Sequence, residues 1–136
     1  MVLELSRKFG VYLPEDVVKD LEICMASMEI KSKSALVREA LKLFINEHRW
    51  KAGKEAVGVI GVIYNHHAKD ADKKLTDVQH SYLDIVIATM HVHLDEEKCM
   101  LAIIVRGNTD RIKKLIGGLS SVKGVEVTRP LLLATD

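Results

Sequence analysis

The stretch IVIATMHVHLDEEKCMLAIIVR, residues 85–106, decides the fold of the half of the chain that surrounds it. Two runs rich in apolar and β-branched residues, 85–94 and 99–106, flank a short acidic segment at 95–97. Such runs favour strands, and a short polar segment between two of them is typical of a turn. The stretch therefore predicts a β-hairpin.

The same hairpin carries side chains that bind metals. Residues two apart on a strand point to one face, so His91 and His93 can reach one ion together, and Cys99 returns beside them after the turn. His80 lies upstream on a predicted helix and must arrive from a different direction. Three imidazoles and one thiol complete a metal site. The alternative is that these are ordinary core or interface histidines and a small buried cysteine.

Further segments extend the hairpin into a domain. The apolar run 56–64 predicts a buried strand, and residues 71–83 predict a helix. Asn108 is predicted to cap a helix that runs to about residue 120, and residues 124–133 predict a last strand. The resulting βαββαβ order is the ferredoxin-like arrangement seen in ACT domains, which bind small molecules.

The first fifty residues have a different pattern. Residues 8–13 alternate as a half-buried strand does, and two amphipathic helices follow, one opened by Pro14 and one by the residues 32–34. Cys24 falls on the apolar stripe of the first helix, which predicts a core position. One strand and two helices cannot close a core alone, so we expect a dimer with paired strands. This order resembles the ribbon-helix-helix DNA-binding fold.

The predicted fold class is therefore α+β. An N-terminal ribbon-helix-helix domain at residues 1–50 precedes a ferredoxin-like, ACT-like domain at residues 51–136. No apolar run approaches the eighteen residues of a membrane span, and two cysteines fit a reducing cytoplasm. A net charge of +1 argues against a protein that coats nucleic acid, although it leaves room for a small basic reading surface.

Resemblance to ribbon-helix-helix proteins implies a set of DNA contacts. The ribbon would direct Lys8, Gly10 and Tyr12 toward base edges in the major groove. The start of the second helix would hold a phosphate through Ser32, Lys33 and Ser34. The alternative for this second group is a helix cap beside a solvated lysine.

Across nearly the whole chain, the sequence resembles the nickel-responsive transcriptional regulators, the NikR family. The resemblance is carried by Gln79-His80, by ATMHVH at 88–93 and by Cys99, with Tyr64-Asn65-His66 and Arg106-Gly107 in matching places. It implies a planar Ni(II) site made by His80, His91, His93 and Cys99. It also implies that His80 comes from a neighbouring subunit of a homotetramer, a dimer of dimers.

Some positions depart from the family pattern. Gly10 stands where a small hydroxyl side chain is usual, and Tyr12 is bulkier than usual, so the operator sequence does not transfer. Ala35 replaces an acidic residue, which leaves Glu39 alone at a second cation site. The family pattern also suggests accessory roles for His66 in cation binding and for Lys69 in phosphate contact.

These features favour a cytoplasmic, nickel-dependent repressor of nickel uptake that binds operator DNA. The alternative is a metal-binding or storage module of the same fold that senses another metal or no longer reads DNA. Nitrogen and sulfur ligands in a plane suit Ni(II) or Cu(II), whereas Zn(II) prefers a tetrahedron. We expect no enzyme, because four protein ligands leave a planar ion no open position.

Overall fold

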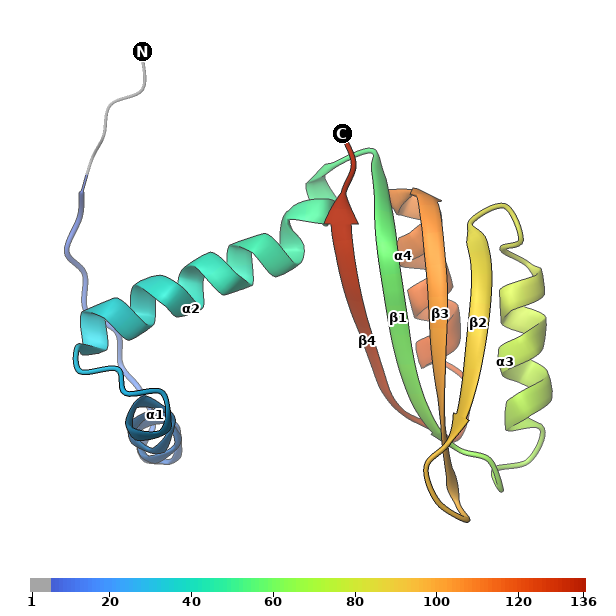
Figure 1. Ribbon diagram of the computed structural model, residues 1–136, viewed down its shortest axis with the longest axis horizontal. Coiled ribbons are helices and arrows are strands. Elements are labelled where there is room, and N and C mark those ends of the chain that lie inside the picture. The colour runs from blue at the N-terminus through green and yellow to red at the C-terminus, as the bar shows by residue number, and fades with distance from the viewer. Residues whose placement is uncertain (1–5) are drawn as a thin grey trace. The chain divides into compact units, whose positions relative to one another are not determined.

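A computed structural model describes residues 6–136 of the chain (Figure 1). The helices and strands are, in order, α1 (Glu15–Ser27), α2 (Lys33–His48), a 3-10 turn (Arg49–Ala52), β1 (Glu55–Asn65), α3 (Ala71–His80), β2 (Val86–His93), β3 (Lys98–Asn108), α4 (Thr109–Ser120) and β4 (Val125–Ala134). They form two compact units, one that ends at Lys42 and one from Leu43 to Asp136. The assignment of residues 1–50 to a DNA-binding domain stays a prediction.

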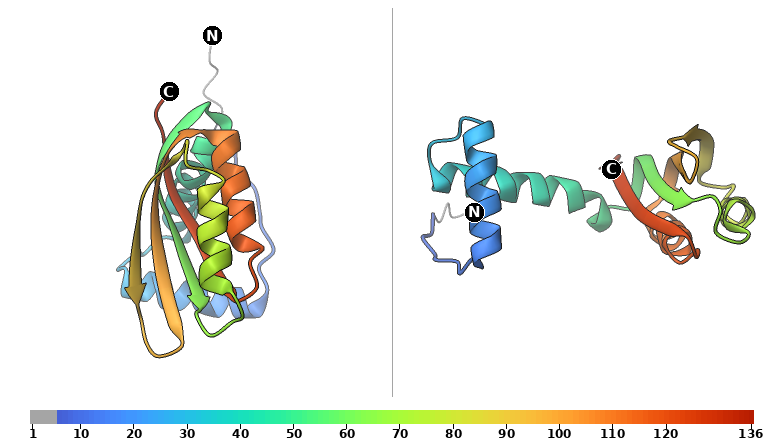
Figure 2. Two further views of the ribbon diagram at one scale, coloured as in Figure 1. Left: turned by 90° about the vertical axis from the view of Figure 1, so that its right-hand side faces the viewer. Right: turned by 90° about the horizontal axis from the view of Figure 1, so that it is seen from below.

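The second unit has the predicted βαββαβ order. Its four strands form one antiparallel sheet in the order β2-β3-β1-β4, so β2 and β4 are the edge strands. The helices α3 and α4 cover one face of this sheet (Figure 2). The ferredoxin-like fold predicted from the sequence is therefore confirmed. Across residues 6–136, the helices lack the length and apolar character needed to cross a membrane.

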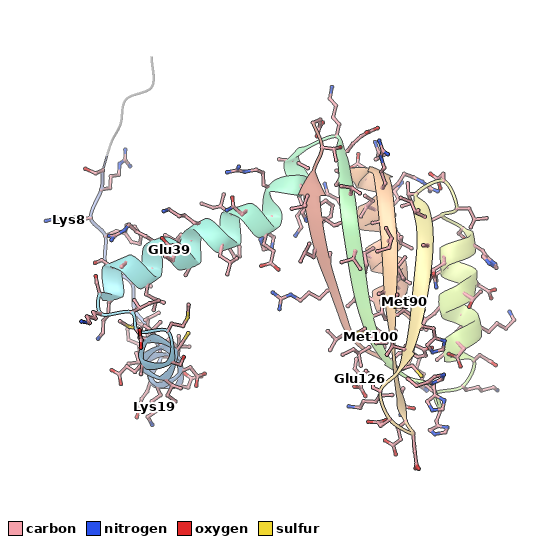
Figure 3. All side chains as sticks on the ribbon, in the orientation of Figure 1. Lys8, Lys19, Glu39, Met90, Met100 and Glu126 are labelled. Carbon is pink, nitrogen blue, oxygen red and sulfur yellow. The ribbon has the colours of Figure 1, made fainter. Side chains whose placement is uncertain are left out.

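The core of this unit lies between the sheet and its two helices. Alternate residues of the central strands, such as Ile60 on β1 and Ile103 on β3, are fully buried, as is Leu115 on α4. Each such side chain contributes about 1.5–3 kcal/mol by leaving water. The opposite sheet face remains apolar and open, and Met90 and Met100 lie on it (Figure 3).

The helix α3 is shorter than predicted. It ends at His80, where the sequence pattern predicted a helix through residue 83, and Leu83 is exposed. Residues 81–85 form a hydrogen-bonded turn in which the Ile85 and Val86 N–H groups both donate to the Tyr82 carbonyl. Ending the helix here lets Ile85 enter the core, which explains the difference.

In the first unit both predicted helices are confirmed, but the predicted core is not. No residue of α1 is buried, and Cys24 is exposed, so the prediction of Cys24 as a core residue is wrong for the single chain. The apolar stripe of α1 has too little of the same chain to pack against. It is the stripe of a helix that needs another surface.

The strand predicted at residues 8–13 is also absent from the single chain. The segment from residue 6 to Pro14 is neither helix nor strand, and Lys8 lies in it (Figure 3). A strand needs a neighbour for its backbone hydrogen bonds, and this segment has none within residues 6–136. The alternating pattern of residues 8–13 therefore does not form a strand in the single chain.

Candidate metal centre

The register of the sheet brings the predicted ligands of the hairpin together. Cys99 on β3 lies directly opposite Tyr64 on β1 and His93 on β2, and His91 lies opposite Leu101. Residues directly opposite one another share a face of the sheet. Because Tyr64, Cys99 and Leu101 are buried on the helix-covered face, His91 and His93 face the same side. They are exposed, since β2 is an edge strand.

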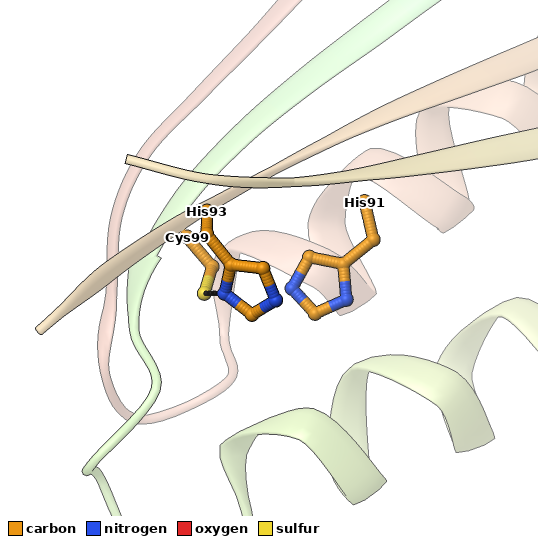
Figure 4. Close-up of side chains that lie close together, drawn as sticks. All are labelled: His91, His93 and Cys99. Atoms are coloured by element: carbon orange, nitrogen blue, oxygen red, sulfur yellow. Dashed lines mark hydrogen bonds between the residues drawn. The ribbon is translucent and has the colours of Figure 1, made fainter. Parts of the chain in front are cut away.

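His91, His93 and Cys99 form one cluster (Figure 4). One ligand atom from each lies within 4.8 Å of the others, and Cys99 Sγ lies 3.3 Å from His93 Nδ1. Nitrogen and sulfur ligands about 2.0 and 2.3 Å from one ion are about 3.1 Å apart at a right angle and about 3.5 Å apart at the tetrahedral angle. The observed spacing fits a first-row transition metal and is compatible with either geometry.

His80 does not join this cluster within the chain. It is the last residue of α3 and lines a cavity of about 440 Å³ together with His91, between α3 and the sheet. The structure thus brings three of the four predicted ligands together and places the fourth beside them. A metal held by these three residues would have room for a fourth donor, such as His80.

A pair of hydrogen bonds behind the cluster holds the His91 ring. The Tyr64 hydroxyl donates to the Asp72 carboxylate, and Tyr64 Oη lies 3.2 Å from His91 Nε2. Burial first, and then the Asp72 carboxylate, raise the pKa of Tyr64 well above its usual range, so the hydroxyl stays protonated. Its one hydrogen goes to Asp72, so its oxygen can accept from His91 Nε2 in the tautomer that carries a hydrogen there. That nitrogen would have to lose the hydrogen in order to bind a metal.

Sequence reasoning missed the role of Asp72. A carboxylate in the first turn of a helix is readily explained by the helix dipole, so the residue gives no separate signal. Its contact with Tyr64 depends on how α3 packs on β1. Only the three-dimensional arrangement shows it.

A second link joins α3 to the strand of the histidines. The Thr89 hydroxyl on β2 donates to Gln79 Oε1 at 2.6 Å, and Gln79 Nε2 donates to the Leu75 carbonyl at 3.2 Å. Gln79 is buried and directly precedes His80, whereas Thr89 lies two residues before His91. This bond fixes the end of α3 relative to β2.

The residues predicted at accessory sites lie apart from the cluster. His66 hydrogen-bonds through Nε2 to the Glu96 carbonyl, and its ring lies tilted against that of His67, with ring centroids 4.1 Å apart. Lys69 is exposed in the loop before α3. In the first unit, Glu39 forms an exposed ion pair with Lys42 at 3.4 Å.

The residues predicted to contact DNA are all exposed: Lys8, Gly10, Tyr12, Ser32, Lys33 and Ser34. Ser32 Oγ accepts a hydrogen bond from the Ala35 N–H at 3.2 Å, which is the contact of a helix cap. The cap that was an alternative to phosphate binding is therefore present in the structure. Lys8, Gly10 and Tyr12 lie in the segment that forms no strand in the single chain.

Comparison with known proteins finds that this chain is similar to nickel-responsive regulators. Residues 57–132 match the family model described as the NikR C terminal nickel binding domain. Proteins named "Putative nickel-responsive regulator" are similar to this chain over most of their length. That of Dictyoglomus turgidum is 40% identical over 89% of this chain and 90% of its own. That of Methanocaldococcus jannaschii is 38% identical over 88% and 86%, and that of Pyrococcus horikoshii 34% identical over 98% and 96%.

Among solved structures, an uncharacterized protein from Thermotoga maritima matches with a TM-score of 0.51 at 18% identity. The match covers 57% of this chain and 99% of that one. At this identity the likeness shows the fold alone, and it agrees with the α+β fold described above.

Proposed function

This chain belongs to the NikR family of nickel-responsive regulators, and we propose that it is a repressor of nickel uptake whose affinity for operator DNA rises when Ni(II) is bound. Members of this family are regulators and not enzymes. The observation that carries the proposal is the cluster of His91, His93 and Cys99, which presents two imidazoles and a thiol to one point.

The proposed nickel site consists of these three residues and His80. Imidazole and thiolate ligands suit nickel, copper and zinc, so the donor set agrees with the family without selecting nickel alone. When bound, Ni(II) would supply a cross-link between His80 and the hairpin. We propose that His80 comes from a neighbouring subunit, which would place the site at an interface of a homotetramer. The open apolar face of the sheet, where Leu131 is 63% exposed, supports assembly through this unit.

The proposed DNA-binding part is the first fifty residues, paired with those of a second subunit. The exposed stripe of α1 and the unpaired segment at 8–13 support this pairing, because each lacks a neighbour within residues 6–136. Paired strands would direct Lys8, Gly10 and Tyr12 to base edges. The start of α2 would hold a phosphate, with Ser32, Lys33 and Ser34 as donors. We expect the protein to act in the cytoplasm, where its operator is.

Nickel and DNA would be coupled by a shift in population. A site shared between subunits favours those arrangements of the tetramer in which His80 meets the hairpin ligands. If such an arrangement also spaces the two ribbons to fit two half-sites, the two binding events favour each other. Glu39, His66 and Lys69 would have accessory roles in this state, in binding a second cation or the DNA backbone.

The first test is a nickel titration of the metal-free protein, followed by the absorption bands of thiolate-bound nickel. We expect tight binding by the wild-type protein, and loss of both affinity and bands in Cys99→Ser. Cys24→Ser is the matched control, because Cys24 is exposed in the other unit and its replacement should change neither. Equal binding by Cys99→Ser and Cys24→Ser would refute the proposed site.

The second test asks for DNA binding. Selection from random duplexes with the nickel-loaded protein should enrich one sequence, and Lys8→Ala should weaken binding to it more than to random DNA. Equal weakening on both would make Lys8 a phosphate contact. Tight nickel binding without any enriched sequence would favour the alternative, a metal-binding or storage module of the same fold.

A further inference from the structure

One side chain of α4, Arg111, contacts the hydrogen-bonded turn between α3 and β2 at several points. Its Nε donates to Asp84 Oδ2 at 3.0 Å, and its Nη2 donates to Asp84 Oδ1 at 2.7 Å and to the Ser81 carbonyl at 3.2 Å. The guanidinium carbon also lies 4.5 Å from the centre of the Tyr82 ring. One planar cation therefore contacts three of the residues that follow His80.

The backbone of Arg111 is held in place by the cap and the buried residues of α4. Its backbone N–H donates to Asn108 Oδ1 at 3.2 Å, which caps α4, and the next residue, Ile112, is fully buried. The hydrogen bond from Arg111 also holds the pKa of Asp84 below its usual range, so the carboxylate remains charged near neutral pH. The guanidinium thus joins the turn to the first turn of α4, which packs on the sheet.

The His80 ring has no such support of its own. Among residues 6–136 no hydrogen bond fixes its imidazole, which is exposed at the last position of α3. The last carbonyls of a helix lack partners within it, and helix ends fray. The position of the His80 ring therefore depends on the backbone that directly follows it, and Arg111 binds the Ser81 carbonyl in that backbone.

We propose that Arg111 is a positioning residue for His80, acting through Ser81 and Asp84. The inference rests on the proposed function, in which His80 is a nickel ligand. It holds whether His80 completes the site of its own chain or that of a neighbour, because the turn belongs to the chain that carries His80. Arg111 touches none of the proposed ligands and acts through the turn that follows His80.

This role differs from a contribution to stability. Asp84 and Arg111 are partly exposed, and exposed ion pairs stabilise a fold little. Residues that orient a metal ligand, in contrast, typically change metal affinity by about 10- to 100-fold when replaced. Because Arg111 is two steps from the ion, we expect the lower end, about tenfold. A lysine cannot reproduce the fork that binds both Asp84 oxygens and the Ser81 carbonyl.

The test is a nickel titration of the whole chain and of five variants, one of which is His80→Ala alone. Arg111→Met keeps a long apolar side chain and removes the guanidinium, and it is studied alone and together with His80→Ala. Arg129→Met is the matched control, since Arg129 pairs with Glu47 at 3.3 Å on β4, at the other edge of the sheet. Asp84→Asn is a second way to weaken the same contact should Arg111→Met fail to fold.

We expect about tenfold weaker nickel binding in Arg111→Met, a smaller loss in Asp84→Asn and none in Arg129→Met. The thiolate bands should persist in all three, because Cys99 is untouched. In the His80→Ala background, Arg111→Met should cause no further loss of nickel affinity, because the side chain that Arg111 positions is absent.

Three results would overturn the inference. The first is unchanged affinity in both Arg111→Met and Asp84→Asn, and the second is the same loss with and without His80. Full affinity in His80→Ala alone would overturn it as well, since Arg111 would then have no ligand to position. These outcomes differ from a failure of the proposed function, in which the wild-type protein itself would bind nickel weakly or without thiolate bands.

Discussion

The hydrogen bond between Thr89 and Gln79 can be removed with almost no change of shape. Thr89→Val replaces the hydroxyl by a methyl group of similar size, so the packing of β2 is kept while Gln79 Oε1 loses its donor. The amide of Gln79 keeps its bond to the Leu75 carbonyl. The variant therefore isolates one link between α3 and the sheet.

The size of the effect follows from the surroundings of Gln79. A buried acceptor left without a partner costs about 1–3 kcal/mol, whereas a typical hydrogen bond contributes about 0.5–1.5 kcal/mol net. Gln79 is buried but lines the cavity of about 440 Å³, where water can take the place of the lost donor. We therefore expect a loss of about 1 kcal/mol, which lowers the melting temperature of a domain of this size by about 4–8 °C.

Thermal denaturation of the metal-free protein measures this loss, with Thr76→Val as the matched control. Thr76 also lies on the cavity, but its hydroxyl is exposed and donates to the Asp72 carbonyl within its own helix at 2.9 Å. Its replacement should change stability by less than about 0.5 kcal/mol. If the two variants melt at the same temperature, the bond between Thr89 and Gln79 does not stabilise the protein and the reasoning fails.

Two glycines should respond in opposite ways to alanine, as urea denaturation will show. Gly124→Ala should cost at least about 1–3 kcal/mol, because Gly124 has φ +102° and a Cβ there would lie 2.5 Å from Ala68 Cβ. Gly117→Ala should stabilise α4 by about 0.5–1 kcal/mol, since its Cβ would meet open space. The Glu97 and Lys98 N–H groups hold the pKa of Asp95 below its usual range. Asp95 therefore contributes stability above about pH 4 that is lost as the pH falls through its pKa in the folded protein. Asp95→Asn should lose less stability than the wild-type protein between pH 7 and pH 3. An equal loss would exclude this contribution.

The elements of the second unit follow from local patterns. The apolar and β-branched runs of β1, β2 and β3 predict strands, because each run is a local property of its own segment. The helix α4 begins where Asn108 accepts hydrogen bonds from Asp110 and Arg111, as its side chain type predicts. Local information also places His91, His93 and Cys99 together, since a hairpin joins neighbours in the sequence.

The errors occur where a pattern depends on something distant. Alternation at residues 8–13 and the stripe that includes Cys24 describe faces suited to burial, but not the surface that would bury them. The end of α3 could not be predicted from its own residues, because Leu83 continues the helical pattern. What ends the helix is the entry of Ile85 into the core and the contact of Asp84 with α4, both set by the fold.

The candidate site was only partly predictable for the same reason. Tyr64 reaches His91 because the register aligns three strands, and Asp72 reaches Tyr64 because α3 packs over β1. Neither contact joins neighbours in the sequence. The two contacts support His91, which is one of the three proposed ligands that the hairpin sequence alone indicates.

The four proposed ligands differ in how the fold holds them, and this difference bears on switching. Three lie on the hydrogen-bonded ladder between β2 and β3, which joins two strands of the central sheet. His80 lies instead at the end of α3, which the bonds made by Thr89 and Arg111 connect to β2 and α4. A switch requires a part whose position depends on the ligand, and His80 is the one ligand of the four that the sheet does not fix. Thr89→Val and Arg111→Met should therefore weaken the nickel-dependent gain in DNA affinity while thiolate-bound nickel persists, whereas Cys99→Ser should abolish both.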